Sequence, residues 1–228
     1  MNLSDLHRRL LQDVLETGNA LPFVITGGYA VQAHGLVDRL SKDIDVATDS
    51  SMPMDALANL LSSGLTDRGW RVRIIGTAPL SARFMVTDPE LDDAECEVGI
   101  LRENFSRSPE DTPYGPVLAL DDVIGTKVRA LAERAAARDL IDVHSASRWR
   151  STAELENLGR RHAWDSFSLE GLALRLDGCL WRDDEEFFAY GLAEEDLVEL
   201  RRWAQAWADD IRLRLASETF VGDDDDLP

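Results

Sequence analysis

The sequence predicts a mixed α/β (α+β) fold in which a small mixed β-sheet with flanking helices is followed by a helical C-terminal part. The first observation is that short apolar runs with strand-like alternation are separated by helical segments over residues 22–101. The second is that only helical patterns occur after residue 150. Hydrophobic residues make up 44% of the 228 residues, which is enough to form a core.

The first half of the chain alternates between helix and strand. Leucines recur at helical spacing behind Ser4, a residue type that caps helices. An apolar run then predicts a buried strand that ends at two glycines, and a later segment alternates acidic and apolar residues, as a half-buried strand does. The expected elements are helices over residues 4–17, 29–36 and 53–65, and strands over residues 22–26, 43–47, 70–75, 82–86 and 94–101.

The second half is expected to be helical. Residues 121–137 begin with acids and end near arginines, as the helix dipole favours, and the helix continues or restarts through residues 138–147. A last long helix is expected over residues 193–215. These patterns predict a catalytic core over residues 1–148, a helical region over residues 149–217 and a flexible acidic tail over residues 218–228.

The composition excludes several classes of protein. A net charge of −19 makes the chain as a whole repel nucleic acid and anionic membranes. The two cysteines, Cys96 and Cys179, belong to no metal-binding or disulfide pattern. No apolar run approaches the roughly 20 residues that span a bilayer, and no signal-peptide pattern opens the chain. We therefore expect a cytoplasmic protein with no membrane contact.

The turn at Gly27 and Gly28 is a candidate phosphate site. It ends a predicted strand and opens a helix, so the backbone can approach a phosphate closely and free N–H groups point toward it. Arg39 and Ser41 follow in the next loop and complete the candidate nucleotide-binding set. A Gly-Gly turn alone is weak evidence, because such turns are common.

Asp43 and Asp45 make the interpretation more specific. Residues i and i+2 of a strand point to the same side, so the two carboxylates project together and favour a divalent cation such as Mg²⁺ between them. A two-metal site usually has a third carboxylate ligand. We prefer Glu97 over Glu95 for this role, because Glu97 lies deeper in its apolar strand. The competing interpretation is a strand end with solvated acids.

The helical segment after residue 120 supplies two further candidates. Lys127 is positioned to hold nucleotide phosphates, and it is one of only two lysines, the other being Lys42. Asp142 has three interpretations: it orients Lys127, assists an acceptor, or pairs with Arg138. Arg134 and Asp139 have the simpler interpretation of an ion pair on the helix face.

With these motifs, the chain resembles the polymerase-β-like nucleotidyltransferase superfamily, and within it the AbiEii/AbiGii type of toxin nucleotidyltransferase. The resemblance covers residues 22–148. It differs in having Glu where the third acid is often Asp, and in a longer spacing from Gly28 to Asp43. The matching stretches are residues 27–30, 39–45, 127–131 and 138–142, with an acidic strand at Glu97.

The resemblance implies a magnesium-dependent enzyme, with two ions in its site, that moves a nucleoside monophosphate from an NTP to an acceptor and releases pyrophosphate. It assigns metal binding to Asp43, Asp45 and Glu97, phosphate binding to Gly27, Gly28, Arg39, Ser41 and Lys127, and a catalytic role to Asp142. It also implies an RNA acceptor, for instance a tRNA 3′ end, and an antitoxin partner.

Two alternatives remain open at this point. A small-molecule nucleotidyltransferase that modifies aminoglycoside-type antibiotics fits the acidity, because an acidic cleft attracts polycations. A non-catalytic regulatory relative is disfavoured, because it has no chemical need for paired acids. The hypothesis of an RNA acceptor requires a local basic surface, and eight of the 24 basic residues lie from Lys127 to Arg161. The competing interpretation is that these arginines pair with neighbouring acids.

Overall fold

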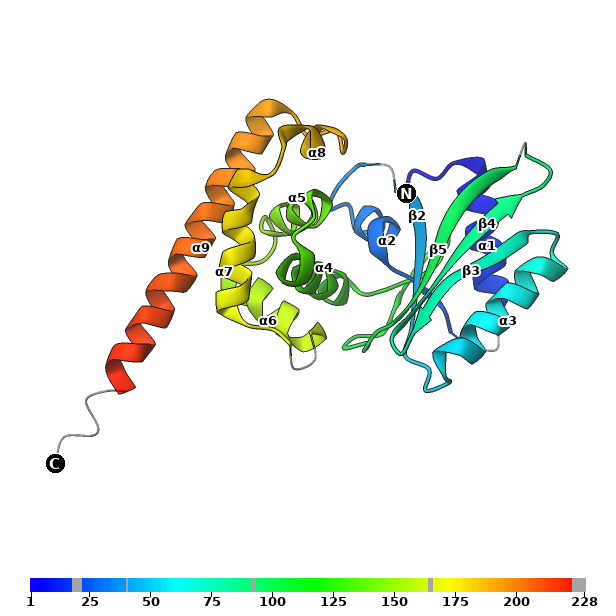
Figure 1. Ribbon diagram of the computed structural model, residues 1–228, viewed down its shortest axis with the longest axis horizontal. Coiled ribbons are helices and arrows are strands. Elements are labelled where there is room, and N and C mark those ends of the chain that lie inside the picture. Colours follow the sequence, from blue (N-terminus) through cyan, green and yellow to red (C-terminus); the bar gives the residue numbers. More distant parts are fainter. Residues whose placement is uncertain (18–21, 40, 92, 164–165, 223–228) are drawn as a thin grey trace. The chain divides into compact units, whose positions relative to one another are not determined.

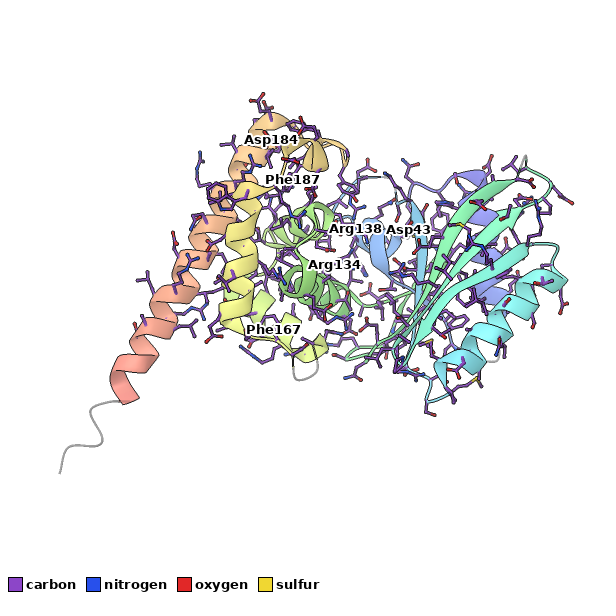
Figure 2. All side chains as sticks on the ribbon, viewed as in Figure 1. Asp43, Arg134, Arg138, Phe167, Asp184 and Phe187 are labelled. Carbon is purple, nitrogen blue, oxygen red and sulfur yellow. The ribbon has the colours of Figure 1, made fainter. Side chains whose placement is uncertain are left out.

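The computed structural model describes residues 1–17, 22–39, 41–91, 93–163 and 166–222 (Figure 1). The chain divides into two compact units, Met1–Val123 and Ile124–Pro228. The predicted catalytic core over residues 1–148 therefore takes in the whole first unit and the start of the second. The first unit contains a mixed sheet with flanking helices, and the described part of the second is helical, so the predicted mixed α/β fold is confirmed.

The first unit is built on a seven-stranded sheet with the order β3-β4-β5-β2-β1-β7-β6. β2 runs parallel to β5 and β1 runs parallel to β7, whereas the other neighbouring pairs are antiparallel. The strands are β1 (Val24–Ile25), β2 (Asp43–Thr48), β3 (Arg71–Ala78), β4 (Ser81–Asp88), β5 (Ala94–Arg102), β6 (Glu110–Thr112) and β7 (Gly115–Val117). β2 and β5 lie in the middle of the sheet, where each has a hydrogen-bonded strand on both sides.

Alternation along the central strands separates a core face from a polar face. Phe84, Val98 and Ile44, from β4, β5 and β2, are fully buried on the core face. Helices α1 (Asp5–Thr17) and α3 (Met54–Asp67) contact each other, and α3 packs on β3 and β4 (Figure 1). Helix α2 (Gly27–Ala33) contacts β2.

Two local features of the first unit differ from the sequence-based expectation. The helix predicted over residues 29–36 begins at Gly27, so the two glycines form its first turn. The short hairpin of β6 and β7 was not predicted, because its strands contain acids, Gly115 and Pro116 in place of the alternating apolar residues typical of strands. Val117 pairs with Ile25 and extends the sheet beyond β1.

In the second unit, α4 ends and a new helix begins after it. Ala135 has a φ of 48° and ends the run, after which α5 restarts at Ala137. The helices are α4 (Leu120–Arg134), whose first turns belong to the first unit, α5 (Ala137–Ala146), α6 (Thr152–His162), α7 (Leu169–Gly178), the 3-10 turn η2 (Cys179–Trp181), α8 (Asp184–Phe188) and α9 (Glu194–Gly222).

The core of the second unit lies where α9 packs on α5, α7 and α8. Trp207 is buried there and donates its indole N–H to Glu156 over 2.9 Å. Helix α9 continues to Gly222, and the end of the predicted acidic tail, residues 223–228, lies outside the described residues. No helix in the described part of the chain is long and apolar enough to cross a membrane.

Candidate active site

The acidic pair projects from the polar face of β2. Ile44 and Val46 are fully buried on the opposite face, so Asp43 and Asp45 share the side that their spacing predicts. The Asp45 side chain is only 19% exposed, which places its carboxylate well inside the first unit and not on a solvated strand end. The two acids are therefore held by a central strand with buried neighbours.

Glu97 lies directly beside Asp43. The two residues are in register on the parallel strands β5 and β2, which are spaced about 4.8 Å apart in a sheet. Glu95 is in register with Thr87 on the other side of β5, is exposed, and accepts a hydrogen bond from the Thr87 hydroxyl over 3.3 Å. The geometry thus favours Glu97 over Glu95 as the third carboxylate of this group.

Two glycines make room for the Asp45 carboxylate. A Cβ atom placed on Gly27 would lie 2.4 Å from Oδ2 of Asp45, and one placed on Gly99 would lie 2.4 Å from Oδ1. Gly27 also has a φ of +61°, a conformation that other residues rarely adopt. Any side chain at either position would displace Asp45, so the glycines determine where this carboxylate lies.

The loop before β2 folds over the start of α2. A Cβ atom on Gly28 would lie 2.4 Å from the Ser41 Oγ and 3.7 Å from an Arg39 Nη atom. The Ser41 hydroxyl donates to the Asp43 carbonyl over 3.1 Å, and the Gln32 amide donates to the Arg39 carbonyl over 2.6 Å. Gly28, Ser41 and Arg39 therefore lie together beside the acidic pair.

Arg83 on β4 joins the acids and was not predicted. Its Nη1 lies 2.5 Å from Glu97 Oε1 and 4.0 Å from Asp45 Oδ1. Arg83 is in register with Gly99, which has no side chain to separate the guanidinium from Asp45. The alternation of residues 81–88 places Arg83 on the polar face, but the register that brings it to Glu97 is a long-range property.

A group of uncharged side chains lies near Asp43. Burial raises the pKa of Cys96 to about 12, with a further contribution from Asp43, and burial likewise raises the pKa of Tyr29 to about 12. The Tyr29 hydroxyl is 2.5 Å from Nδ1 of His7, and burial lowers the pKa of His7 against the opposing effect of Asp43. At neutral pH these groups add no charge around Asp43.

The second unit contains the remaining predicted catalytic residues. Lys127 of α4 pairs with Asp142 of α5, with 2.8 Å between Nζ and Oδ2. The Lys127 side chain is 10% exposed and that of Asp142 is fully buried. Of the alternatives for Asp142, the structure shows the pairing with Lys127.

The arginines between Lys127 and Arg161 differ in the partners that they contact. Arg134 makes a two-bond ion pair with the buried Asp139, at 2.8 and 3.0 Å, so the predicted helix-face pair is present. Arg129 donates to the His162 carbonyl over 2.8 Å. Three others are exposed to solvent: Arg148, Arg160 and Arg161. Pairing with acids therefore accounts for only part of the predicted basic surface.

The donors of the first unit fit a divalent cation in their chemistry. Asp43, Asp45 and Glu97 offer the hard carboxylate oxygens that Mg²⁺ prefers, and Gly27 and Gly99 make room for the Asp45 carboxylate itself. Within the described residues, no three His, Cys, Asp or Glu side chains converge into a preformed metal site.

The amino-acid sequence matches one protein family over most of its length. The model described as "Nucleotidyl transferase AbiEii toxin, Type IV TA system" matches residues 9–213. None of the curated proteins compared with the chain matches it.

Two solved structures share the fold. JHP933 from Helicobacter pylori is 18% identical, with a TM-score of 0.53, over 97% of this chain and 100% of that chain. MenT4, the nucleotidyltransferase toxin Rv2826c from Mycobacterium tuberculosis H37Rv, is 17% identical, with a TM-score of 0.58, over 90% of this chain and 82% of that chain. At these identities the likeness concerns the fold.

Proposed function

Because the chain belongs to the AbiEii family of nucleotidyltransferase toxins, we propose that it transfers a nucleoside monophosphate from an NTP to the 3′ end of an RNA. The family confirms the resemblance and the enzyme class that the motifs predict. The family is that of type IV toxin–antitoxin systems, so we also propose an antitoxin partner for this chain.

The observation that supports this chemistry best is the arrangement of three carboxylates on one sheet face. Asp43 and Asp45 lie on β2, and Glu97 is in register with Asp43 on the neighbouring strand. We assign cation binding to these residues, with Mg²⁺ as the ion that matches their oxygen ligands. When bound, a divalent cation activates an acceptor hydroxyl and stabilises the departing pyrophosphate.

The neighbouring loop suits the binding of a triphosphate. The Ser41 hydroxyl and the Arg39 guanidinium lie beside Gly28, whose lack of a side chain makes room for them. Arginine forms two-bond contacts with phosphate, and such charge-assisted bonds are stronger than neutral ones. We assign NTP binding to Gly27, Gly28, Arg39 and Ser41, which orient the α-phosphate toward the acceptor.

The transfer itself is a single displacement at phosphorus. The acceptor hydroxyl oxygen forms a bond to the α-phosphorus, and the bond from that phosphorus to the bridging oxygen breaks. The pyrophosphate leaves with that oxygen, and the hydroxyl proton passes to water. In this scheme Lys127 and Asp142 are assigned to catalysis on their sequence pattern alone, with Lys127 as a phosphate-binding cation.

The RNA acceptor rests on the family and on the exposed part of the second unit. Arg148, Arg160 and Arg161 are exposed, and Trp149 beside the first of them is 62% exposed. Cations that contact phosphates and an aromatic ring on which a base stacks are the usual components of single-stranded RNA binding. The net charge of −19 favours the second candidate, a polycationic antibiotic of the aminoglycoside type.

The test is a transfer assay with purified protein, Mg²⁺ and each α-labelled NTP, offered total tRNA in one reaction and an aminoglycoside panel in another. We expect label on tRNA, and we expect its loss with Asp43→Ala/Asp45→Ala. The matched control is Asp49→Ala, which removes an exposed acid directly after the same strand. Omitting Mg²⁺, with a chelator present, is expected to abolish the transfer.

Each outcome separates the candidates. Label on the antibiotic and none on tRNA would replace the RNA proposal with the small-molecule one. Equal activity in the doubly substituted protein would contradict the assignment of Asp43 and Asp45 while leaving the family unchanged. Transfer that persists with the chelator present would contradict the divalent cation.

A further inference from the structure

Arg83 lies among the carboxylates of the proposed cation site. Its Nη1 is 2.5 Å from a Glu97 carboxylate oxygen and 4.0 Å from an Asp45 oxygen. The guanidinium thus lies between two of the three carboxylates assigned to cation binding. Like charges placed this closely need positive charge between them, and here part of that charge comes from the chain itself.

The sheet holds Arg83 in this position. Arg83 is directly across from Gly99, and Glu97 is directly across from Met85 on the same strand as Arg83. A Cβ atom on Gly99 would lie 2.4 Å from the Asp45 oxygen and 3.7 Å from the Arg83 Nη1. The bare backbone of Gly99 therefore gives space to both groups, and the strand register sets their separation.

The charges of the group argue for a single additional cation. Arg83 supplies one positive charge to the three carboxylates, which lowers the positive charge that metal ions must supply there. The guanidinium engages Glu97 Oε1, and Asp43 and Asp45 share one face of the adjacent strand, where they form the natural ligand pair. A closely placed fixed cation repels a second divalent ion from the same carboxylates.

We propose that Arg83 takes the place of one metal ion, so that this enzyme binds a single divalent cation at Asp43 and Asp45. Arg83 is then a positioning residue that engages Glu97 and supplies fixed positive charge beside Asp45. This inference rests on the proposed nucleotidyl transfer, and it replaces the two-ion site that the family resemblance implies with a one-ion site.

The test counts bound Mn²⁺, which is a paramagnetic substitute for Mg²⁺. The protein is titrated with Mn²⁺ and followed by electron paramagnetic resonance, in the presence of the α,β-methylene analogue of each NTP in turn. Background binding is measured with Asp43→Asn/Asp45→Asn and subtracted. We expect one Mn²⁺ per chain for the unchanged protein and two for Arg83→Gln, which frees Glu97.

Two variants control for charge and for folding. Arg83→Lys keeps the positive charge and is expected to bind one Mn²⁺. Arg73→Gln removes the same charge from an exposed arginine on the neighbouring strand β3, and it too is expected to bind one. Equal thermal unfolding midpoints across the series show that the count reports on the site and not on the fold.

The outcomes distinguish this inference from the proposed function. Two Mn²⁺ in the unchanged protein, or one in Arg83→Gln, would overturn the role of Arg83 as a replacement cation and reduce its pair with Glu97 to an ordinary cross-strand contact. No Mn²⁺ above background in the unchanged protein would overturn the cation site itself, and with it both proposals.

Discussion

At the scale of single residues, the position of Asp45 depends on Gly27 and Gly99, which contribute no side-chain atoms to the chemistry. Each approaches a different oxygen of the Asp45 carboxylate, so a methyl group at either position would move it. The two positions differ in backbone conformation, because only Gly27 has a positive φ. Gly99 therefore offers the cleaner test, since alanine is compatible with its strand backbone.

Gly99→Ala is expected to lower transfer activity by roughly 100-fold, because a displacement of about 1 Å in a positioned catalytic group has effects of this size. The side chain would be 2.4 Å from Asp45 Oδ1, whereas the fold should persist because Gly99 lies in a regular strand. Steady-state kinetics and the thermal unfolding midpoint measure the two effects. Gly76→Ala is the matched control, because nothing lies within 4 Å of its Cβ.

The buried thiols predict a loss of stability in alkali. Burial raises the pKa of Cys96 from 9.0 to about 12 and that of Cys179 from 9.0 to about 11. A pKa that is raised on folding gives stability that is complete below the unfolded value and disappears as the pH rises through the folded value. The free energy of unfolding, measured by urea denaturation, should therefore fall between about pH 9 and 12. Cys96→Ala should flatten this dependence, and an unchanged slope would exclude the thiol as its cause.

For single residues, the sequence predicted correctly the features that depend only on the alternation along one strand. The alternation of β2 was enough to place Asp43 and Asp45 on one face. The choice between Glu95 and Glu97 depended on register with β2, and the position of Arg83 depended on register between β4 and β5. Register is set by packing across the sheet, so a single sequence contains only indirect information about it.

At the scale of elements, α4 and α5 present the pair of Lys127 and Asp142. Both side chains are nearly or completely buried, at 10% and 0% exposure. The pair can affect both stability and catalysis. It affects stability because it is buried, and it affects catalysis if Lys127 binds phosphate. A variant that removes one partner tests both effects at once, and a variant that replaces both partners separates them.

Asp142→Asn is expected to destabilise the protein by about 3–5 kcal/mol, because it leaves the Lys127 charge buried without its partner. Lys127→Met/Asp142→Leu should recover most of that stability, since replacing a buried ion pair with apolar residues is often neutral. If Lys127 binds phosphate, the double variant stays inactive although it is folded. Chemical denaturation and the transfer assay give the two readouts, and an active double variant would contradict the catalytic assignment.

The elements themselves were largely predictable, with two informative exceptions. The hairpin of β6 and β7 is stabilised by its pairing with β1 and not by its own composition, so local propensity does not reveal it. The break between α4 and α5 occurs at Ala135, a residue with high helix propensity in the left-handed region. Tertiary packing decides both, which explains why the sequence left open whether that helix continues or restarts.

At the scale of the whole molecule, the negative net charge disfavours the RNA acceptor that we propose. A net charge of −19 disfavours binding of RNA, the acceptor that we propose, whereas the exposed arginines of the second unit favour it. The sequence alone predicted the charge and the cluster of basic residues but not which arginines are paired. The structure shows Arg134 in an ion pair with the buried Asp139, and it shows Arg148, Arg160 and Arg161 exposed to solvent.

RNA binding by this chain is therefore expected to depend only weakly on salt. If the exposed Arg148, Arg160 and Arg161 are the phosphate contacts, the logarithm of the affinity for single-stranded RNA should fall with the logarithm of salt concentration at a slope of about −2. Substituting all three with Gln should bring the slope near zero, as measured by fluorescence anisotropy. Substituting Arg175, Arg202 and Arg212 of α7 and α9 removes equal charge and should leave the slope unchanged. A steep slope that survives the first substitution would place the RNA contacts elsewhere on the chain.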